Sequence, residues 1–133
     1  MTEQTLFIIK PDAVARKLVG QIVSRFENKG FKILKVKMFT FTKDQAEEFY
    51  SVHSSKPFFG ELVSFISSGP VVAAVIEGNN AIATTRLLVG ATKSYEAAPG
   101  SIRGDFGLGI SDNIIHASDS KESFEKEAKV VFK

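Results

Sequence analysis

The sequence predicts an α+β sandwich, in which helices pack on a four-stranded antiparallel sheet. Three observations support this class. Strand-like apolar runs alternate with amphipathic, helix-like segments along the whole chain. Their order is strand, helix, strand, two helices, strand, helix, long loop, strand, helix. No repeat, low-complexity tract or linker interrupts the 133 residues, so we expect a single domain spanning 1–133.

The N-terminal half begins with "TLFIIK", a buried strand that stops at Pro11. Asp12 is expected to cap the next helix, which Gly30 closes. Apolar side chains recur in that helix at four-residue steps: Val14, Leu18, Ile22 and Phe26. "KILKVKMFTF" then predicts a half-solvated strand, in which Lys35 and Lys37 alternate with three apolar residues. Those residues are Leu34, Val36 and Met38.

"TKDQ" at 42–45 is a capping box, and it opens a helix with one mixed face. That face carries Ala46, Phe49, Tyr50 and His53. A second short helix follows Pro57 and groups Phe58, Leu62, Phe65 and Ile66. "VVAAVI" is apolar at every position, which predicts a strand buried on both faces.

The C-terminal half contains a helix from Asn79 or Asn80 to Gly90 and a glycine-rich loop over 91–112. "NIIHA" is the last predicted strand and "SDSKESFEKEAKVVF" the last helix. This order and sequential pairing suggest a ferredoxin-like sandwich with helices over one face of the sheet. That fold carries unrelated activities, so it does not decide the function.

The composition narrows the possible functions. A formal net charge of +2 is too small to indicate a nucleic-acid ligand, but it suits an anionic one. The absence of cysteine excludes disulfide and thiolate chemistry. The longest purely apolar run is too short to span a membrane, and Glu3 does not suit a signal peptide. We therefore expect a cytoplasmic protein.

Two cations break the local patterns. Arg86 shares a helical stripe with Ile82 and Val89, where an aliphatic residue is expected. Lys10 ends an apolar strand, at the place where small α/β folds hold ligands. The alternatives are an arginine that extends past the rim of the core and a solvated lysine.

The loop "APGSIRGDFGLG" combines four glycines with Arg103, so its backbone amides and one guanidinium can approach an anion. A surface loop with turn glycines is the alternative. Nucleotide-binding motifs of other folds are absent, because neither a GxxxxGK[ST] loop nor a GxGxxG loop occurs.

"NIIHASDS" places His116 at the end of an apolar strand. A lone histidine there is more often structural than catalytic. However, the Ser118–Asp119–Ser120 cluster can cap the next helix, with Asp119 and Glu122 in capping-box spacing. Glu127 on that helix can reach one ring nitrogen and leave the other to attack. The cations, the loop and this imidazole together indicate phosphate chemistry.

Four stretches of the chain resemble the nucleoside diphosphate kinase family, and the similarity covers nearly all of it. They are "TLFIIKPDAV", "KPFFGELVSFISSGPVVAAVIEG", "APGSIRGDFG" and "NIIHASDS". The resemblance implies exchange of a γ-phosphoryl group between nucleoside triphosphates and diphosphates by a ping-pong mechanism through a phosphohistidine. It also implies Mg²⁺, held mainly through the phosphates, and a homo-oligomer, most often a hexamer, with a tetramer or dimer as alternatives.

The resemblance assigns roles residue by residue. It makes His116 the nucleophile, with Glu127 orienting it and Tyr50 and Ser118 beside it. Phosphates would be bound by Lys10, Arg86, Thr92 and Arg103. Asn113, with Lys10, would meet the ribose, while Phe58, Leu62 and Ile110 would hold the base. Stacking does not distinguish the hydrogen-bonding groups of the different bases, so low base selectivity is predicted.

Three departures from the family pattern are visible. Ala117 stands where most relatives have glycine, "TKS" at 92–94 replaces a common T-N-P, and Ser101 replaces threonine. Two other readings remain. "RGDFGLGI" superficially resembles the core strand of an RNA-recognition module, although Asp105 shifts its register. An inactive relative would lack the nucleophile or a cation, and both are present. His53 is expected to be structural or to border the site.

Overall fold

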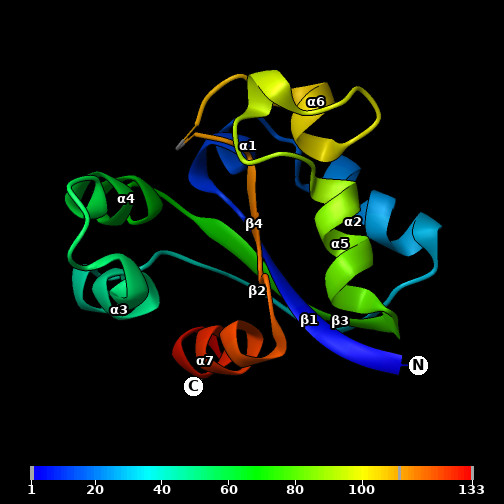
Figure 1. Cartoon of the computed structure of the whole chain (residues 1–133), viewed down its shortest axis with the longest axis horizontal. Coiled ribbons are helices and arrows are strands. Elements are labelled where there is room, and N and C mark those ends of the chain that lie inside the picture. The colour runs from blue at the N-terminus through cyan, green and yellow to red at the C-terminus, as the bar shows by residue number, and fades with distance from the viewer. Residues whose placement is uncertain (1, 111, 133) are drawn as a thin grey trace.

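The computed structural model describes residues 2–110 and 112–132. Its centre is a four-stranded antiparallel sheet with the strand order β2-β3-β1-β4 (Figure 1). The strands are β1 (Thr2–Ile9), β2 (Lys32–Phe39), β3 (Val71–Asn79) and β4 (Ile115–Ala117). This is the ferredoxin-like sandwich that the sequence predicts, although consecutive strands pair only between β2 and β3.

Seven α-helices surround the sheet within the described residues. They are α1 (Pro11–Ala15), α2 (Val19–Lys29), α3 (Lys43–Phe49), α4 (Phe59–Ile66), α5 (Ala81–Val89), α6 (Ile102–Phe106) and α7 (Lys121–Val131). Two 3₁₀ turns, Ser51–His53 and Ser94–Glu96, complete the regular structure. In this part of the chain no helix has the length and hydropathy of a membrane span.

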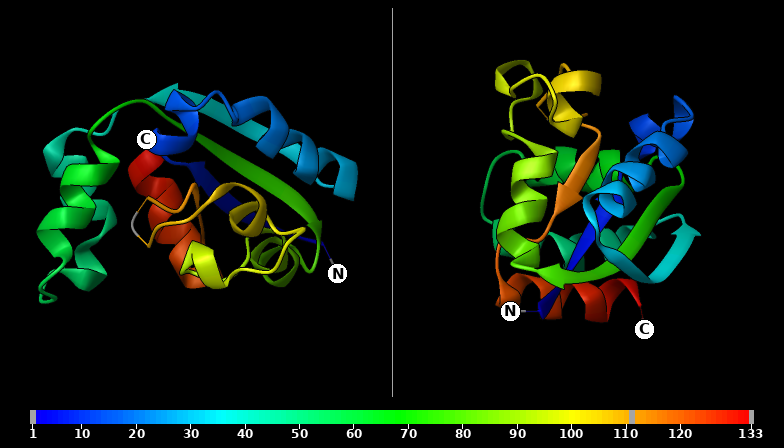
Figure 2. Two further views of the ribbon diagram at one scale, coloured as in Figure 1. Left: turned by 90° about the horizontal axis from the view of Figure 1, so that it is seen from above. Right: turned by 90° about the vertical axis from the view of Figure 1, so that its right-hand side faces the viewer.

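Helices cover both faces of the sheet, so the expectation of a single covered face is wrong. Phe7 and Ile9 of β1 pack into a core with Ile22 and Phe26 of α2, and this core extends to α5. Leu6 of β1 faces a second core, which α3, α4 and α7 cover. The two groups of helices lie on opposite sides of β1 in Figure 1, and Figure 2 shows the arrangement from above and from the side. The central strands are apolar at consecutive positions, so each face needs its own cover.

The predicted first helix is two helices. The chain breaks after α1, where Lys17 adopts a positive φ of 62°. Asp12 does not cap α1, which begins after Lys10 with Pro11 at its first position. Proline has a preset helical φ, and its missing N–H is one of those that the first helical turn leaves without an intrahelical partner. The Asp12 carboxylate instead accepts a hydrogen bond from the backbone N–H of Ile114, 3.1 Å away.

Strand β2 exposes apolar side chains. Its register shifts between Ile33 and Lys35. Val36 and Met38 are 58% and 61% exposed, whereas Lys37 is half-buried and donates to the backbone O of Val131 at the end of α7. The predicted alternation is therefore present, but its apolar side faces outward.

Helix boundaries follow local chemistry at several ends. The capping box at Thr42 forms as predicted, and α5 runs between Asn80 and Gly90. Helix α7 is capped by Ser120, whose Oγ accepts from the N–H of Ser123. The predicted capping box of Asp119 and Glu122 is not formed, because Asp119 accepts the Oγ–H of Ser123 instead.

Candidate active site

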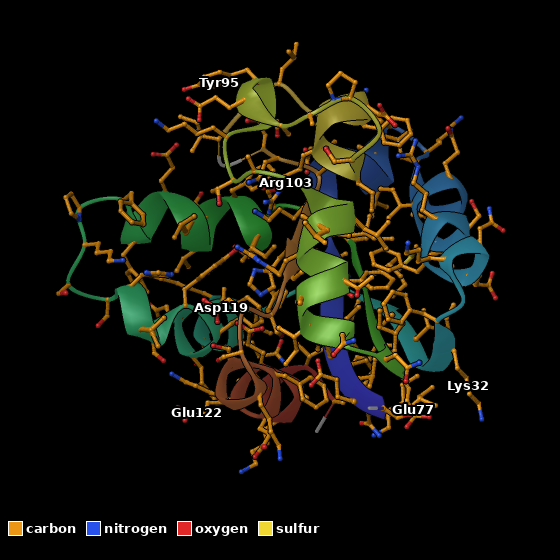
Figure 3. All side chains as sticks on the ribbon, turned by 45° about the vertical axis from the view of Figure 1, so that its right-hand side comes forward. Lys32, Glu77, Tyr95, Arg103, Asp119 and Glu122 are labelled. Atoms are coloured by element: carbon orange, nitrogen blue, oxygen red, sulfur yellow. The ribbon has the colours of Figure 1, made fainter. Side chains whose placement is uncertain are left out.

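A cleft of about 580 Å³ opens beside β4. Figure 3 labels Arg103 and Asp119 near the space between α4 and α5. Residues from distant parts of the chain line the cleft: Lys10, Tyr50, His53, Phe58, Glu61, Leu62, Arg86, Thr92, Arg103, Ile110, Asn113 and His116. It thus combines three cations, one imidazole carried by a strand, and several apolar side chains.

His116 is held by the helix that follows it. Its Nε2 lies 2.9 Å from Oε1 of Glu127 on α7, and Ser118 donates its Oγ–H to the same oxygen at 2.6 Å. The ring of Phe49 packs edge-on against the imidazole, with ring centroids 5.1 Å apart. A carboxylate accepts but does not donate, so the neutral ring carries its proton on Nε2. Nδ1 then keeps a lone pair available to a ligand in the cleft.

Lys10 and Asn113 form a polar pair at the end of β1. The Nζ of Lys10 donates to Oδ1 of Asn113 at 2.6 Å, and Nδ2 of Asn113 donates to the backbone O of Thr92 at 2.8 Å. Burial and the neighbouring Arg103 lower the pKa of Lys10 to about 8. The lysine is therefore poorly hydrated, and an anionic ligand would favour its charged form.

Arg103 binds the surrounding backbone as well as facing the cleft. Its guanidinium donates to the backbone O atoms of Asn113, Gly90 and Ile115 at 3.2, 3.1 and 2.6 Å. Burial and the nearby Arg86 lower the pKa of Arg103 to about 10. A guanidinium has five N–H donors, so two remain for a ligand. Arg86 donates one N–H to the backbone O of Ala117.

Part of the cleft lining is apolar and exposed. Phe58 is 44% exposed and Ile110 is 51% exposed, and Leu62 lines the cleft with them. Exposed rings and aliphatic side chains that line a cleft provide a surface for a planar ligand. The ring centroid of His53 lies 6.0 Å from that of Phe58.

Ten of the twelve predicted site residues line this cleft. The other two are Glu127, which is hydrogen-bonded to His116, and Ser118, which is hydrogen-bonded to Glu127. His53 borders the cleft, in agreement with one of its two expected positions. Glu61 also lines the cleft and was not predicted. The sequence could have indicated Glu61, because it follows Phe58 by three positions and such residues lie on the same face of a helix.

The described residues contain no group of three or more histidine, aspartate or glutamate side chains that could hold a metal ion. Asp119 lies beside the site, and the hydrogen bond from Ser123 lowers the pKa of its carboxyl group. The described lining of the cleft itself contains one carboxylate, that of Glu61, and three cations.

The fold and this cleft define an α/β sandwich of the ferredoxin-like type, with a carboxylate-oriented histidine facing three cations. The family model described as "Nucleoside diphosphate kinase" matches residues 3–133. The chain therefore belongs to the nucleoside diphosphate kinase family.

Individual relatives agree with that assignment. The nucleoside diphosphate kinase of Picrophilus torridus is 57% identical over 130 residues, which cover 98% of this chain and 94% of the relative. That of Halalkalibacterium halodurans is 55% identical over 98% of this chain and 88% of its own length. Two solved structures superpose with a TM-score of 0.96: the enzyme of Aquifex aeolicus, and that of Halobacterium salinarum in complex with CDP. They are 50% and 45% identical, and both cover 100% of this chain, with 96% and 89% of their own lengths.

Proposed function

We propose that this chain is a nucleoside diphosphate kinase, a single domain over 1–133 that transfers the γ-phosphoryl group of ATP or another nucleoside triphosphate to a nucleoside diphosphate. One observation carries the proposal. The Nε2 of His116 is bonded to Glu127 at 2.9 Å, in a cleft that Lys10, Arg86 and Arg103 also line. A neutral imidazole with a fixed tautomer is a competent nucleophile at neutral pH.

The reaction proceeds in two half-reactions. In the first, Nδ1 of His116 attacks the γ-phosphorus, a P–N bond forms, and the P–O bond to the leaving diphosphate breaks. In the second, a terminal phosphate oxygen of a different nucleoside diphosphate attacks the phosphohistidine and regenerates the imidazole. Glu127 stabilises the positive charge that the ring acquires during attack.

The cations and the polar pair bind the substrate's charged part. Lys10, Arg86 and Arg103 would neutralise phosphate charge, and Thr92 would add a hydrogen bond. Asn113, with Lys10, would meet the ribose hydroxyls. Tyr50 lines the cleft, and burial and Glu127 raise the pKa of its phenol, so it stays a hydrogen-bond donor.

The base would stack on Phe58, with Leu62 and Ile110 in contact with it. These side chains have no hydrogen-bonding atoms of their own, so all bases should bind with similar affinity. We expect ADP, GDP, CDP and UDP to serve as acceptors with kcat/KM values within about tenfold of one another.

Mg²⁺ would enter with the nucleotide, because phosphate oxygens are the hard ligands that it prefers. When bound, it supplies further neutralisation of phosphate charge. Glu61 lines the cleft and can meet such an ion through water. We also propose a cytoplasmic location, where these nucleotides are made and used.

The family resemblance implies a homo-oligomer, most often a hexamer, and the surface offers a contact that supports association. Val36 and Met38 expose apolar side chains on β2, which lies at the edge of the sheet in the order of the strands. Apolar edge strands favour association with another chain.

The RNA-binding alternative is not favoured. The segment that resembled an RNA-recognition strand begins within α6 and continues as a loop, so it offers no strand face on which bases could stack.

Incubation with γ-labelled ATP and Mg²⁺ tests the proposal. We expect one acid-labile label per chain, on His116, that a nucleoside diphosphate removes. The His116→Ala variant should take up no label, and His53→Ala, which changes the other histidine of the cleft, should still be labelled. Label on His53, or label that persists in His116→Ala, would overturn the assignment.

A further inference from the structure

A strained turn lies between two of the proposed site residues. Ile114 has a φ of 76°, and the N–H of Ile115 donates to the O of Asn113 at 2.8 Å. This hydrogen bond and the positive central φ describe the rare, strained form of the γ-turn. A β-branched residue strongly disfavours a positive φ, so surrounding contacts must hold it there.

Side chains and backbone from two other parts of the chain, the segment around Lys10 and Asp12 and helix α6, hold the turn. Asp12 accepts the N–H of Ile114 with Oδ2 at 3.1 Å. The backbone N–H of Lys10 donates to the O of Ile114 at 2.9 Å. Arg103 donates to the O atoms on either side of Ile114, as described above. The backbone polar groups of the turn are thus bonded from both sides.

The turn determines where the reacting groups lie. Asn113 precedes Ile114 and reaches Lys10 and Thr92 with its side chain. His116 follows Ile114 by two residues and enters β4 opposite Ile8. If Ile114 relaxed to a negative φ, the backbone directions on its two sides would change relative to each other. The imidazole and the Asn113 amide would then no longer face the cleft together.

Lys10 and Arg103 line the cleft, whereas Asp12 does not. The Asp12 carboxylate instead accepts the backbone N–H of the turn. Its second oxygen, Oδ1, is buried without a hydrogen-bond partner among the described residues. Burial raises the pKa of this carboxyl group, and the hydrogen bond from the Ile114 N–H opposes that shift, so the contact with the turn favours the charged carboxylate.

We propose that Asp12 is a positioning residue for phosphoryl transfer: its carboxylate holds Ile114 in the strained turn and so aligns His116 and Asn113. This inference rests on the proposed kinase function. Asp12 would act through the backbone, because its carboxylate hydrogen-bonds the N–H of Ile114.

Two substitutions separate the hydrogen bond from the side chain's shape. Asp12→Asn retains an oxygen that accepts the Ile114 N–H, whereas Asp12→Leu has a similar volume without an acceptor. We expect Asp12→Leu to lower kcat about tenfold or more and to raise KM several-fold, and Asp12→Asn to stay within about threefold. Asp44→Leu is the matched control, because Asp44 occupies the same second position of α3 and lies at the surface. It should leave both constants unchanged.

Glycine at position 114 provides the decisive comparison. Glycine adopts a positive φ without strain, so the turn should depend less on Asp12 in the Ile114→Gly background. Ile114 is fully buried, so circular dichroism at the assay temperature must first show that this background is folded. There, Asp12→Leu should lower kcat by no more than about threefold. An equal loss in both backgrounds would overturn the proposal, as would an Asp12→Leu enzyme with unchanged kcat.

One measurement needs no variant. The amide proton of Ile114 should shift by NMR as the Asp12 carboxyl group titrates, and a constant shift would contradict the contact. The outcome is separable from that of the proposed function. If the unsubstituted chain transfers no phosphate, the function is wrong; if it does and Asp12→Leu matches it, only this inference is wrong.

Discussion

Glu127 accepts two hydrogen bonds at one oxygen, from His116 and from Ser118. In Glu127→Gln the amide can offer either an oxygen or an NH₂ group to the ring, so it no longer selects the Nε2–H tautomer. We expect kcat to fall about 10- to 100-fold with little change in KM. Steady-state kinetics at pH 7 measure both constants.

Ser118→Ala is the companion variant, because it removes one hydrogen bond to Glu127 and leaves the carboxylate in place. Its kcat should fall only a few-fold. If Glu127→Gln retained full kcat, Glu127 would not orient the nucleophile.

Lys10 gives a prediction about pH. Burial lowers its pKa to about 8 in the free protein, and nucleotide phosphates should raise that pKa again. Near and above pH 8, binding therefore takes up a proton, and nucleotide affinity falls as pH rises, by up to about tenfold per pH unit. Below about pH 7, Lys10 is already charged and no uptake is expected from it. Calorimetry at pH 8.5 in two buffers of different ionisation enthalpy measures the uptake.

Lys10→Met is the control, because it removes the titrating group and keeps most of the volume. Its affinity should be lower overall and less dependent on pH above 8. Equal proton uptake in Lys10→Met and the unsubstituted chain would show that another group titrates.

At the residue scale, sequence reasoning found the groups that break local patterns. Arg86 in an aliphatic stripe, Lys10 at a strand end and His116 beside an apolar strand all line the cleft. It assigned Asp12 wrongly, because the position after a strand and before a helix suits a cap. The partner of Asp12, Ile114, is 102 positions away, and no local pattern reports such a contact.

At the scale of elements, two N-caps give a contrast. Thr42 caps α3 with a complete capping box, and Ser120 caps α7. Either residue changed to alanine should lower the free energy of unfolding by about 1 kcal/mol. Only Ser120→Ala should also lower kcat, a few-fold, because α7 carries Glu127. Denaturant unfolding and kinetics on the same samples test this, and an equal kcat for both variants would contradict it.

The elements themselves were predictable where the chemistry is local. The capping box at Thr42 and the closing Gly90 fixed helix ends correctly. The break at Lys17 was not predicted, since the four-residue apolar spacing continues through it. The outward face of β2 was also missed, because periodicity shows which residues share a face but not which way that face points.

For the whole molecule, the central strands could be recognised from their apolar runs. β1 and β3 are buried at consecutive positions and occupy the middle of the sheet. The same runs implied two layers of helices, and the prediction of one covered face overlooked this. Strand order depends on long-range pairing, which periodicity does not report, and the predicted sequential pairing holds only between β2 and β3.

The outward face of β2 leads to a prediction about assembly. Val36 and Met38 are more than half exposed on a strand at the sheet edge, where burial by another copy would stabilise an oligomer. The double variant Val36→Lys/Met38→Lys should therefore sediment as a smaller species than the unsubstituted chain. Its unfolding transition should move to lower temperature and become less dependent on protein concentration, because association stabilises less of the folded state.

Val52→Lys is the matched control, since Val52 is 68% exposed and lies in the 3₁₀ turn that follows α3. It should leave the sedimenting mass unchanged. If the double variant keeps the mass of the unsubstituted chain, β2 is not a contact between copies. If Val52→Lys alone lowers the mass, the contact lies on the side of α3 and α4 instead. Because the cleft lies beside β4, at the opposite edge of the sheet, the double variant should still form phosphohistidine at His116.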